Sequence, residues 1–276
     1  MAVINAGLEA LVVIVVHSRG DLATRSAEIY SRLGLATVLS CTSSSEVDTA
    51  VTGNILRIPN VGYGSAVNAA VVHFRNIALD HPKWIVISND DIEVSENAVD
   101  EVKRILRVIP PSVVAVGFDA ARAWSPGSSG FSIKGSFFAV RWDEFFQCGG
   151  FDPRFFLYFE DTDLFERLSK VGRLALIPIP EIRHRGAGST GKTFRAGFQI
   201  TISAIEFRKA NQASLRDFVE WLTLTVGSSL LSRQLAHSVG VVVGFFAARF
   251  PGLHNSLSKR WFNAATFDQR KEFRLE

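Results

Sequence analysis

The chain has 276 residues, with 30 Lys and Arg against 27 Asp and Glu, and a net charge of +3. Hydrophobic residues make up 47% of it and the mean hydropathy is +0.17, so it can bury a large core in one large domain, or in one ordinary domain plus an appendage. Two cysteines are too few for a disulfide framework. The sequence contains no basic block interleaved with aromatic residues, the pattern typical of nucleic-acid binding. It also contains no window of 18 uncharged apolar residues, which a membrane-spanning helix would need.

The first half of the chain alternates strands and helices. The β-branched run over 11–16 predicts a buried parallel strand rather than the core of a signal peptide. We expect further strands in "ATVLSC", "NILRIP", "WIVIS" and "PPSVVAVGF", and helices over 21–33, 64–79 and from Ser95 to about Val108. This alternation predicts an α/β fold with an open, mainly parallel, Rossmann-like sheet that is covered by helices on both faces.

The pattern changes after Gly127. "FSIKGSFFAVRW" predicts an antiparallel strand, "WDEFFQCGG" a short helix stopped by two glycines, "DTDLFERLSKVG" a helix, and "RLALIPIPEIRHRG" one strand leading to a loop. From about Phe194 the chain is expected to be helical and ends in an apolar, hairpin-like segment. We therefore predict a sheet domain over 1–193 and a helical extension over 194–276. The extension associates with a membrane, forms an oligomer, or serves only as a helical cap on the sheet domain.

The stretch "WIVISNDDIEV" ends a buried strand with Asn89, Asp90 and Asp91. Ligands of open parallel sheets bind beyond the carboxyl ends of the strands. Hard oxygen ligands at that place suit Mg²⁺ or Mn²⁺ bridging phosphates. The competing interpretation is an ordinary turn, after which Ser95 caps the next helix.

A second acidic cluster, Glu160, Asp161 and Asp163, begins a helix after the aromatic run 155–159. Acids are favoured at a helix N-terminus by the macrodipole, and Asp163 can pair with Arg167 one turn on, which would be structural. Apolar neighbours would instead raise the basicity of Asp161, and a rigid carboxylate of that kind is a good general base for a hydroxyl nucleophile.

Two further segments could contact a ligand. His184 follows a strand between two arginines and precedes a Gly-rich loop, so it could be a metal ligand or a phosphate contact, although a lone histidine is usually structural. Gly62 and Gly64 precede a helix that carries Asn68 in its first turns. These glycines would let a ligand approach the backbone closely, or they simply form a tight turn.

Together, "LVVIVVHSRGD", "NVGYGSAVNAA", "ISNDDIEV", "KGSFFAVRWDEFFQCGGFDPRFFLYFEDTDLFERLSKVG" and "PEIRHRGAGST" cover roughly residues 10 to 190. In this order they resemble an inverting glycosyltransferase of the GT-A fold, family 2, in its rhamnosyltransferase-like branch. The resemblance implies that Asp161 is the general base and that Asp91 and His184 touch the metal. It makes the domain 1–193 the nucleotide-sugar-binding and catalytic part.

The resemblance also implies the remaining site residues and partners. The cofactor would be Mg²⁺ or Mn²⁺, the donor a dTDP- or UDP-linked sugar with rhamnose as the candidate, and the acceptor a glycan or lipid-linked glycan of cell-envelope polysaccharide synthesis. The expected location is cytoplasmic, with peripheral contact at the inner face of the membrane as an option. The donor-binding candidates are His17, Ser18, Arg19, Thr42, Asn60, Gly62, Gly64, Asn68, Asn89 and Asp90, and the acceptor-side or supporting candidates are Gly135, Trp142, Glu160, Asp163 and Arg185.

One departure from the family pattern concerns the donor base. Relatives carry an aspartate after the second strand, whereas Cys41 or Thr42 stands there in this chain, so base recognition would use backbone groups or Ser43. This departure favours an alternative, a non-catalytic sugar-nucleotide-binding or scaffold protein of a glycan assembly complex. A nucleotidyltransferase would need a Gly-rich basic loop after the first strand, and "HSRGDLATR" lacks it.

Overall fold

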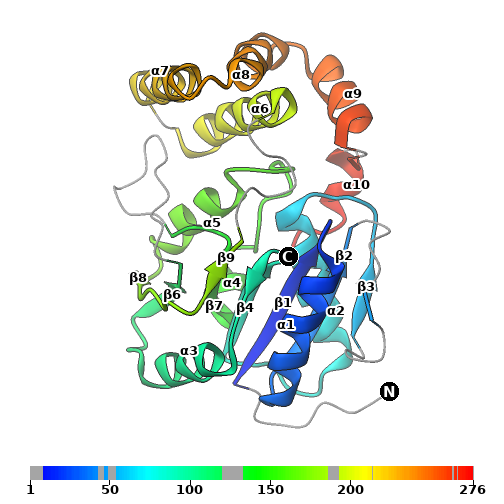
Figure 1. The fold of residues 1–276 in the computed structure, drawn as a ribbon, viewed down its shortest axis with the longest axis vertical. Helices are drawn as coiled ribbons and strands as arrows, with labels where there is room; N and C mark the ends of the chain where they lie inside the picture. Colours follow the sequence, from blue (N-terminus) through cyan, green and yellow to red (C-terminus); the bar gives the residue numbers. More distant parts are fainter. Residues whose placement is uncertain are drawn as a thin grey trace.

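The computed structural model describes residues 9–42, 47–48, 54–119, 133–185, 193–212, 214–262, 264–265 and 267–275. A seven-stranded sheet runs through it, and every neighbouring pair of strands is parallel except those made by β7, which is antiparallel to both β4 and β6 (Figure 1). The predicted open, mainly parallel sheet is confirmed. The strand order is β3 (Ile55–Arg57), β2 (Ala36–Cys41), β1 (Ala10–Val16), β4 (Trp84–Asn89), β7 (Phe137–Arg141), β6 (Val113–Gly117), β8 (Arg173–Leu176).

Helices cover both faces of the sheet. Along β1, Val12 and Ile14 pack in one apolar cluster while Leu11 and Val13 pack in the other, which is why the whole strand is apolar rather than alternating. Burying each such side chain stabilises the fold by roughly 1.5–3 kcal/mol. One face carries α1 (Gly20–Arg32) and α3 (Glu96–Val108), and the other carries α2 (Tyr63–Ile77), α4 (Trp142–Gln147) and α5 (Glu160–Leu168).

The predicted helix boundaries have the expected local causes. Ser95 caps α3, because its Oγ accepts a hydrogen bond of 3.1 Å from the backbone N–H of Ala98. Gly34 follows α1 with a φ of +76°, and two glycines with φ of +76° and +62°, Gly149 and Gly150, follow α4. These left-handed conformations end a helix at little steric cost only in glycine.

The sequence predicts a single strand leading to a loop in the segment that starts at Arg173, whereas the structure has two strands there. The segment contains β8 and a separate two-residue strand, β9 (Arg183–His184), because Pro178 and Pro180 between them have no N–H to donate to a ladder. The strand β9 pairs antiparallel with β5 (Ile92–Glu93), which the sequence analysis did not predict.

The C-terminal part is helical, as predicted; the first three of its helices lie across one end of the molecule, and the last two lead back toward the sheet domain (Figure 1). Within the described residues, no helix combines the length and apolar character needed to cross a membrane. The helices are α6 (Phe194–Asn211), α7 (Leu215–Leu231), α8 (Leu235–Ala247), α9 (Pro251–Phe262) and α10 (Phe267–Lys271).

The end of the chain packs back against the sheet domain. Leu275 is buried in the apolar cluster beneath α2, and the carbonyl of Phe273 accepts a hydrogen bond of 2.9 Å from Asn68 Nδ2. The boundary at residue 193 therefore stays a prediction, since the helical region contributes side chains to the core of the sheet domain.

Close contact between α6 and α8 depends on glycine. A Cβ on Gly240 would lie 2.0 Å from the carbonyl oxygen of Phe194, and one on Gly197 would lie 2.2 Å from the carbonyl oxygen of His237. Both obstructing atoms belong to the backbone of the facing helix, so a side chain cannot be accommodated by a change of rotamer.

We predict that Gly240→Ala destabilises the protein by about 1–3 kcal/mol or more, because the two helices must separate. Gly227→Ala is the matched control: Gly227 also lies within a helix, but a Cβ added to it would meet nothing within 4 Å. This control should gain up to about 1 kcal/mol from helix propensity. Chemical denaturation of both variants measures the difference, and equal effects would contradict the packing.

Candidate active site

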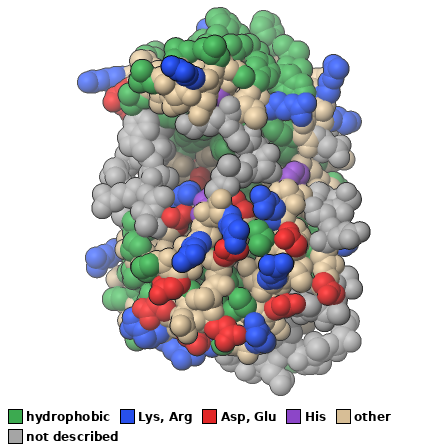
Figure 2. Space-filling model, in the orientation of Figure 1, with side chains coloured by type: hydrophobic (Ala, Val, Ile, Leu, Met, Phe, Trp, Pro, Cys, Tyr) green, Lys and Arg blue, Asp and Glu red, His purple; other side chains and the backbone are tan. Residues whose placement is uncertain are grey.

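A cavity of about 380 Å³ lies beyond the carboxyl ends of β1 and β4. The space-filling view shows a hollow between the C-terminal helices and the sheet domain (Figure 2). The described residues that line the cavity are Val15, His17, Thr42, Asn60, Gly62, Tyr63, Asn89, Asp90, Asp91, Lys134, Gly135, Ser136, Phe156, Leu157, Tyr158, Glu160, Asp161, His184 and Phe262. Four segments predicted from the sequence thus meet at one place.

The short ladder between β5 and β9 brings Asp91 and His184 together. Its register pairs Ile92 with His184, and the N–H of Arg185 donates to the carbonyl of Asp91 at 3.0 Å. As a result His184 Nε2 lies 3.1 Å from Asp91 Oδ2. The two candidate metal ligands, 93 residues apart in sequence, therefore face each other at the cavity wall.

The chemistry of this pair fits a divalent cation. Asp91 is 7% exposed, and its second oxygen, Oδ1, is buried with no hydrogen-bond partner among the described residues. An unpartnered buried carboxylate oxygen is costly unless a cation can reach it. No group of three or more His, Cys, Asp or Glu side chains in the described part of the chain could enclose a metal ion. Mg²⁺ commonly uses one or two protein ligands and takes the others from phosphate and water.

Asp90 organises the loop between β1 and α1. Its Oδ2 accepts three backbone hydrogen bonds, from His17 at 2.9 Å, Ser18 at 2.8 Å and Arg19 at 2.9 Å. His17 lines the cavity, whereas Ser18 and Arg19 are not among its lining residues. The adjacent carboxylates thus have different surroundings, because Asp90 holds a loop and Asp91 faces His184.

Asp161 is held by two backbone donors. The N–H of Gly135 donates to Oδ2 at 2.9 Å, and the N–H of Thr162 donates to Oδ1 at 2.7 Å. A Cβ on Gly135 would lie 2.6 Å from Asp161 Oδ2, so only glycine permits this contact. Tyr158 and Phe159, just before the helix, have φ of +68° and +64°. Left-handed conformations in aromatic residues are strained and persist where the surrounding structure enforces them, as functional sites often do.

The neighbouring carboxyls Glu160 and Asp161 share a buried environment. Burial, and next the charge of Asp161, raise the pKa of Glu160 to about 8. Burial also raises the pKa of Asp161, while the N–H groups of Thr162 and Gly135 oppose that rise by stabilising its carboxylate. At neutral pH Glu160 is therefore mostly protonated, whereas the two N–H groups favour the charged form of Asp161.

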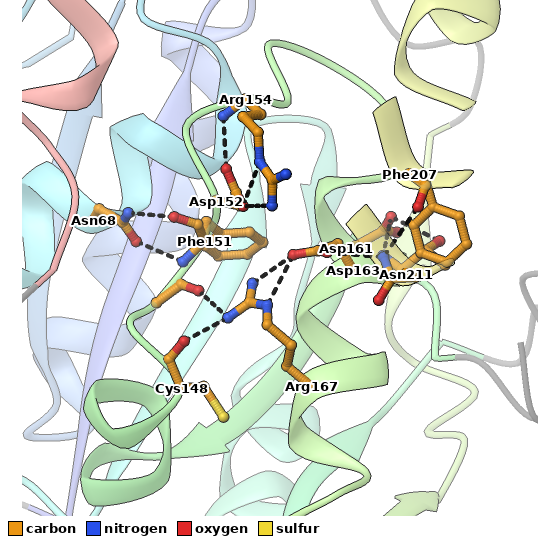
Figure 3. Close-up of polar contacts among 12 residues, drawn as sticks. Asn68, Cys148, Phe151, Asp152, Arg154, Asp161, Asp163, Arg167, Phe207 and Asn211 are labelled. Atoms are coloured by element: carbon orange, nitrogen blue, oxygen red, sulfur yellow. Dashed lines mark hydrogen bonds and ion pairs between the residues drawn. The ribbon is translucent and has the colours of Figure 1, made fainter. Parts of the chain in front are cut away.

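Asp163 has a structural role. Arg167 binds it through Nε at 2.9 Å and donates to the carbonyls of Cys148 and Gly150 at 2.7 Å each (Figure 3). Asn211 of α6 donates to its other oxygen at 3.1 Å. The expected Asp163–Arg167 pair is confirmed, and it ties the helix that carries Asp161 to the loop after α4.

Some of the other predicted residues line the cavity and others do not. Asn60, Gly62, Thr42 and Asn89 line the cavity, and Ser43 lies outside the described residues. Four further candidates are not among the described lining residues, and their contacts lie elsewhere. Asn68 is fully buried and bonds both backbone groups of Phe151 (Figure 3), Gly64 packs on the same phenylalanine, Trp142 stacks on His81, and Arg185 pairs with Glu93.

The fold also brings residues to this site that were not predicted from the sequence. Lys134, Ser136 and Tyr63 line the cavity, and Asp119 accepts hydrogen bonds from Lys134 Nζ at 3.1 Å and from Ser136 Oγ at 2.9 Å. A signal for Lys134 was present, because it directly precedes Gly135. Asp119 follows β6 without any neighbouring motif, so only the fold could identify it.

Comparison with proteins of known function supports the resemblance that the sequence motifs indicate. No protein-family profile matches the chain. It is 27% identical over 179 residues to N-acetylglucosaminyl-diphospho-decaprenol L-rhamnosyltransferase from two strains of Mycobacterium tuberculosis, over 48% of this chain and 58% of the relatives. The match thus spans less than two thirds of the relatives' length, and the chain resembles the rhamnosyltransferase-like branch over that part.

Solved structures confirm the GT-A fold. Mannosyltransferase PcManGT from Pyrobaculum calidifontis, in complex with GDP-Man and Mn²⁺, has a TM-score of 0.54 at 11% identity, covering 90% of this chain and 89% of that one. Glucosyl-3-phosphoglycerate synthase from Mycobacterium tuberculosis, in complex with Mn²⁺, UDP and glucosyl-3-phosphoglycerate, has a TM-score of 0.54 at 12% identity, covering 74% and 81%.

The raised pKa of Glu160 predicts a pH-dependent gain in stability for Glu160→Gln. Between its ordinary pKa near 4.5 and about 8, the folded protein keeps a proton that the unfolded chain has released, so stability falls as pH rises through this window. The glutamine removes that loss. The difference in melting temperature between Glu160→Gln and wild type should therefore increase from pH 4.5 to 8. Each kcal/mol of difference in the free energy of unfolding corresponds to roughly 2–4 °C.

Glu166→Gln on the same helix is the matched control for a lost carboxyl, because Glu166 is outside the cavity lining. Thermal melts of the three proteins across the pH range measure the effect. A difference between Glu160→Gln and wild type that does not change with pH would contradict the assignment.

Proposed function

We propose that the protein is an inverting glycosyltransferase that moves a sugar from a nucleotide-diphosphate donor to a hydroxyl group of a glycan acceptor. The observation that carries the proposal is the position of Asp161, which is oriented by Gly135 and Thr162 at the wall of the cavity that Asp91 and His184 also line. A proton acceptor and a place for a diphosphate therefore share one cavity, as a displacement at a sugar carbon requires.

Asp161 acts as the general base. It accepts the proton of the acceptor hydroxyl as that oxygen bonds to the anomeric carbon, and the bond from this carbon to the diphosphate breaks with its electron pair leaving on the nucleotide. Attack from the face opposite the leaving group inverts the anomeric configuration. The raised pKa of Asp161 makes it a stronger base than an exposed aspartate, provided the pH is high enough to ionise it.

Asp91 and His184 would hold Mg²⁺ or Mn²⁺. When bound, such an ion supplies positive charge to the leaving diphosphate. Asp90 supports the donor side indirectly, since it fixes the loop from which His17 enters the cavity, where His17 Nδ1 lies 3.1 Å from Thr42 Oγ1. The candidate sugar is rhamnose and the candidate nucleotide dTDP or UDP, on the strength of the curated relatives' name and the sequence resemblance.

The acceptor side of the cavity is apolar. This side has apolar side chains where the donor side has carboxylates. The residues that line it are Phe156, Leu157, Tyr158 and Phe262. Aromatic rings provide faces on which sugar rings can pack. A lipid-linked glycan fits this wall, and the relatives' name specifies a diphospho-decaprenol substrate for those proteins.

A lipid-linked acceptor would require the enzyme to reach a membrane surface, and α7, α8 and the start of α9 suit this. Exposed large side chains gather there and form an apolar cap at one end of the molecule (Figure 2). From Trp221 to Phe262 the sequence has no Asp or Glu, and it has four basic residues, Arg233, Arg249, Lys259 and Arg260. Asp217 and Glu220 lie in the first turns of α7, so the acid-free part of the cap begins after them. An apolar face whose charges are basic complements an anionic lipid surface. The exposed side chains are Leu215, Val219, Leu224, Leu230, Leu231, Leu235, Val239, Val242, Val243, Phe246, Phe250 and Leu253.

We predict that Asp161→Asn lowers the transfer rate by about 10²–10⁴-fold while nucleotide binding persists, because the amide cannot accept the proton. Transfer from UDP- and dTDP-sugars and thermal shifts with the nucleotides are the measurements. Asp143→Asn, on an exposed position of α4, is the control for a lost carboxylate. Undiminished transfer by Asp161→Asn would overturn the base assignment, and nucleotide binding without transfer by wild type would favour the non-catalytic alternative.

For the membrane contact, we expect the protein to float with phosphatidylcholine vesicles that contain about 30% phosphatidylglycerol and less with phosphatidylcholine alone. Leu231→Glu combined with Leu235→Glu should abolish flotation, since both side chains are strongly exposed. Leu79→Glu, an exposed leucine on the sheet domain, is the matched control. The apolar cap is an oligomer interface instead if the wild-type protein does not float and forms a dimer, while the double variant is a monomer.

A further inference from the structure

The charges around the cavity are unbalanced. Four carboxyl side chains line it, from Asp90, Asp91, Glu160 and Asp161. Among the described lining residues, Lys134 is the single Lys or Arg. A nucleoside diphosphate that enters such a cavity brings further negative charge, so a cation must offset the repulsion. The proposed metal at Asp91 and His184 is one source of positive charge, and the ammonium of Lys134 is a second one that the chain itself provides.

Lys134 is placed beside the proposed metal ligands. Its Nζ lies 3.0 Å from His184 Nδ1 and 3.1 Å from Asp119 Oδ2. Asp91 lies on the other side of the imidazole, at its Nε2. The ring of His184 therefore lies between two positive charges: the cation proposed on the Asp91 side and the ammonium of Lys134 on the other side.

The surroundings leave Lys134 able to bind an anion. The side chain is 35% exposed and reaches the cavity. An ammonium has three N–H donors. Among the described residues, Asp119 accepts one of them, and His184 Nδ1 accepts a second only in the tautomer that carries the ring proton on Nε2. Asp119 also accepts a hydrogen bond from Ser136 Oγ, so its carboxylate does not depend on Lys134 alone.

We propose that Lys134 is a binding residue for the diphosphate of the nucleotide donor, and that it acts beside the divalent cation rather than through it. This inference rests on the proposed function. The third N–H of the ammonium donates to a phosphoryl oxygen, and its charge stabilises the diphosphate as the electron pair of the broken sugar–oxygen bond moves onto it. Because this cation belongs to the chain, part of the affinity for a nucleoside diphosphate persists without metal.

The test measures binding of UDP and dTDP by isothermal titration calorimetry, in Mn²⁺ and separately in EDTA. Lys134→Met removes the charge and keeps the length of the side chain, and we expect it to weaken binding about tenfold or more in both buffers, as for the loss of one charge-assisted contact. The salt dependence of binding should also become shallower. Lys134→Arg keeps the charge and should retain part of the affinity. Lys170→Met, an exposed lysine outside the cavity lining, is the control.

Asp119→Asn separates phosphate binding from a structural ion pair. It removes the negative partner of Lys134 but leaves the ammonium, so binding should be kept or strengthened. If Asp119→Asn weakens binding as much as Lys134→Met, Lys134 acts only through its ion pair and the inference fails. Unchanged affinity in Lys134→Met also overturns it, while the proposed function stands. If wild type binds neither nucleotide in Mn²⁺, both the inference and the proposed function are overturned.

Discussion

The contact between the backbone of Gly135 and the carboxylate of Asp161 is the constraint on which the candidate site depends. The glycine N–H lies 2.9 Å from Oδ2, and there is no room for a Cβ between them. This contact joins the segment that enters β7 to the start of α5, and the next residues on either side, Lys134 and Ser136, reach the same cavity. One hydrogen bond therefore sets the position of the proposed base relative to the groups that would meet a diphosphate.

Keeping two acids side by side in a buried place lowers stability, and the rest of the domain offsets this. Glu160 stays protonated at neutral pH because burial and the charge of Asp161 raise its pKa and oppose its ionisation. The network of Arg167 holds the same helix to the loop after α4. The strained backbone at Tyr158 and Phe159 lies directly before this pair. A raised pKa and local strain are features that a catalytic acid or base commonly requires and that a purely structural helix start does not.

The C-terminal helices complete the cavity as well as covering the sheet domain. Phe262 of α9 lines it, and Asn60 donates to the carbonyl of the same residue at 2.9 Å. Tight glycine contacts between α6 and α8 fix one layer of these helices, which leaves the outward faces of α7 and α8 apolar and exposed. The acceptor side of the proposed reaction and the proposed lipid contact are thus built from one part of the chain, while the donor side is built from the sheet.

Local patterns determined much of this protein from sequence alone. Runs such as that of β1 predicted the strands, and Ser95, Gly34 and the two glycines after α4 predicted helix ends, because caps and left-handed turns depend on a few neighbouring residues. The motifs around Asp91, Asp161 and His184 could be recognised for the same reason. The tertiary structure decided what depends on distant segments: the β5–β9 register that brings His184 to Asp91, the burial of Asn68 and Trp142 away from the cavity, and the arrival at it of Lys134, which pairs with Asp119. Pairing between residues nearly a hundred positions apart leaves no periodic trace in the sequence, so only the folded chain could reveal it.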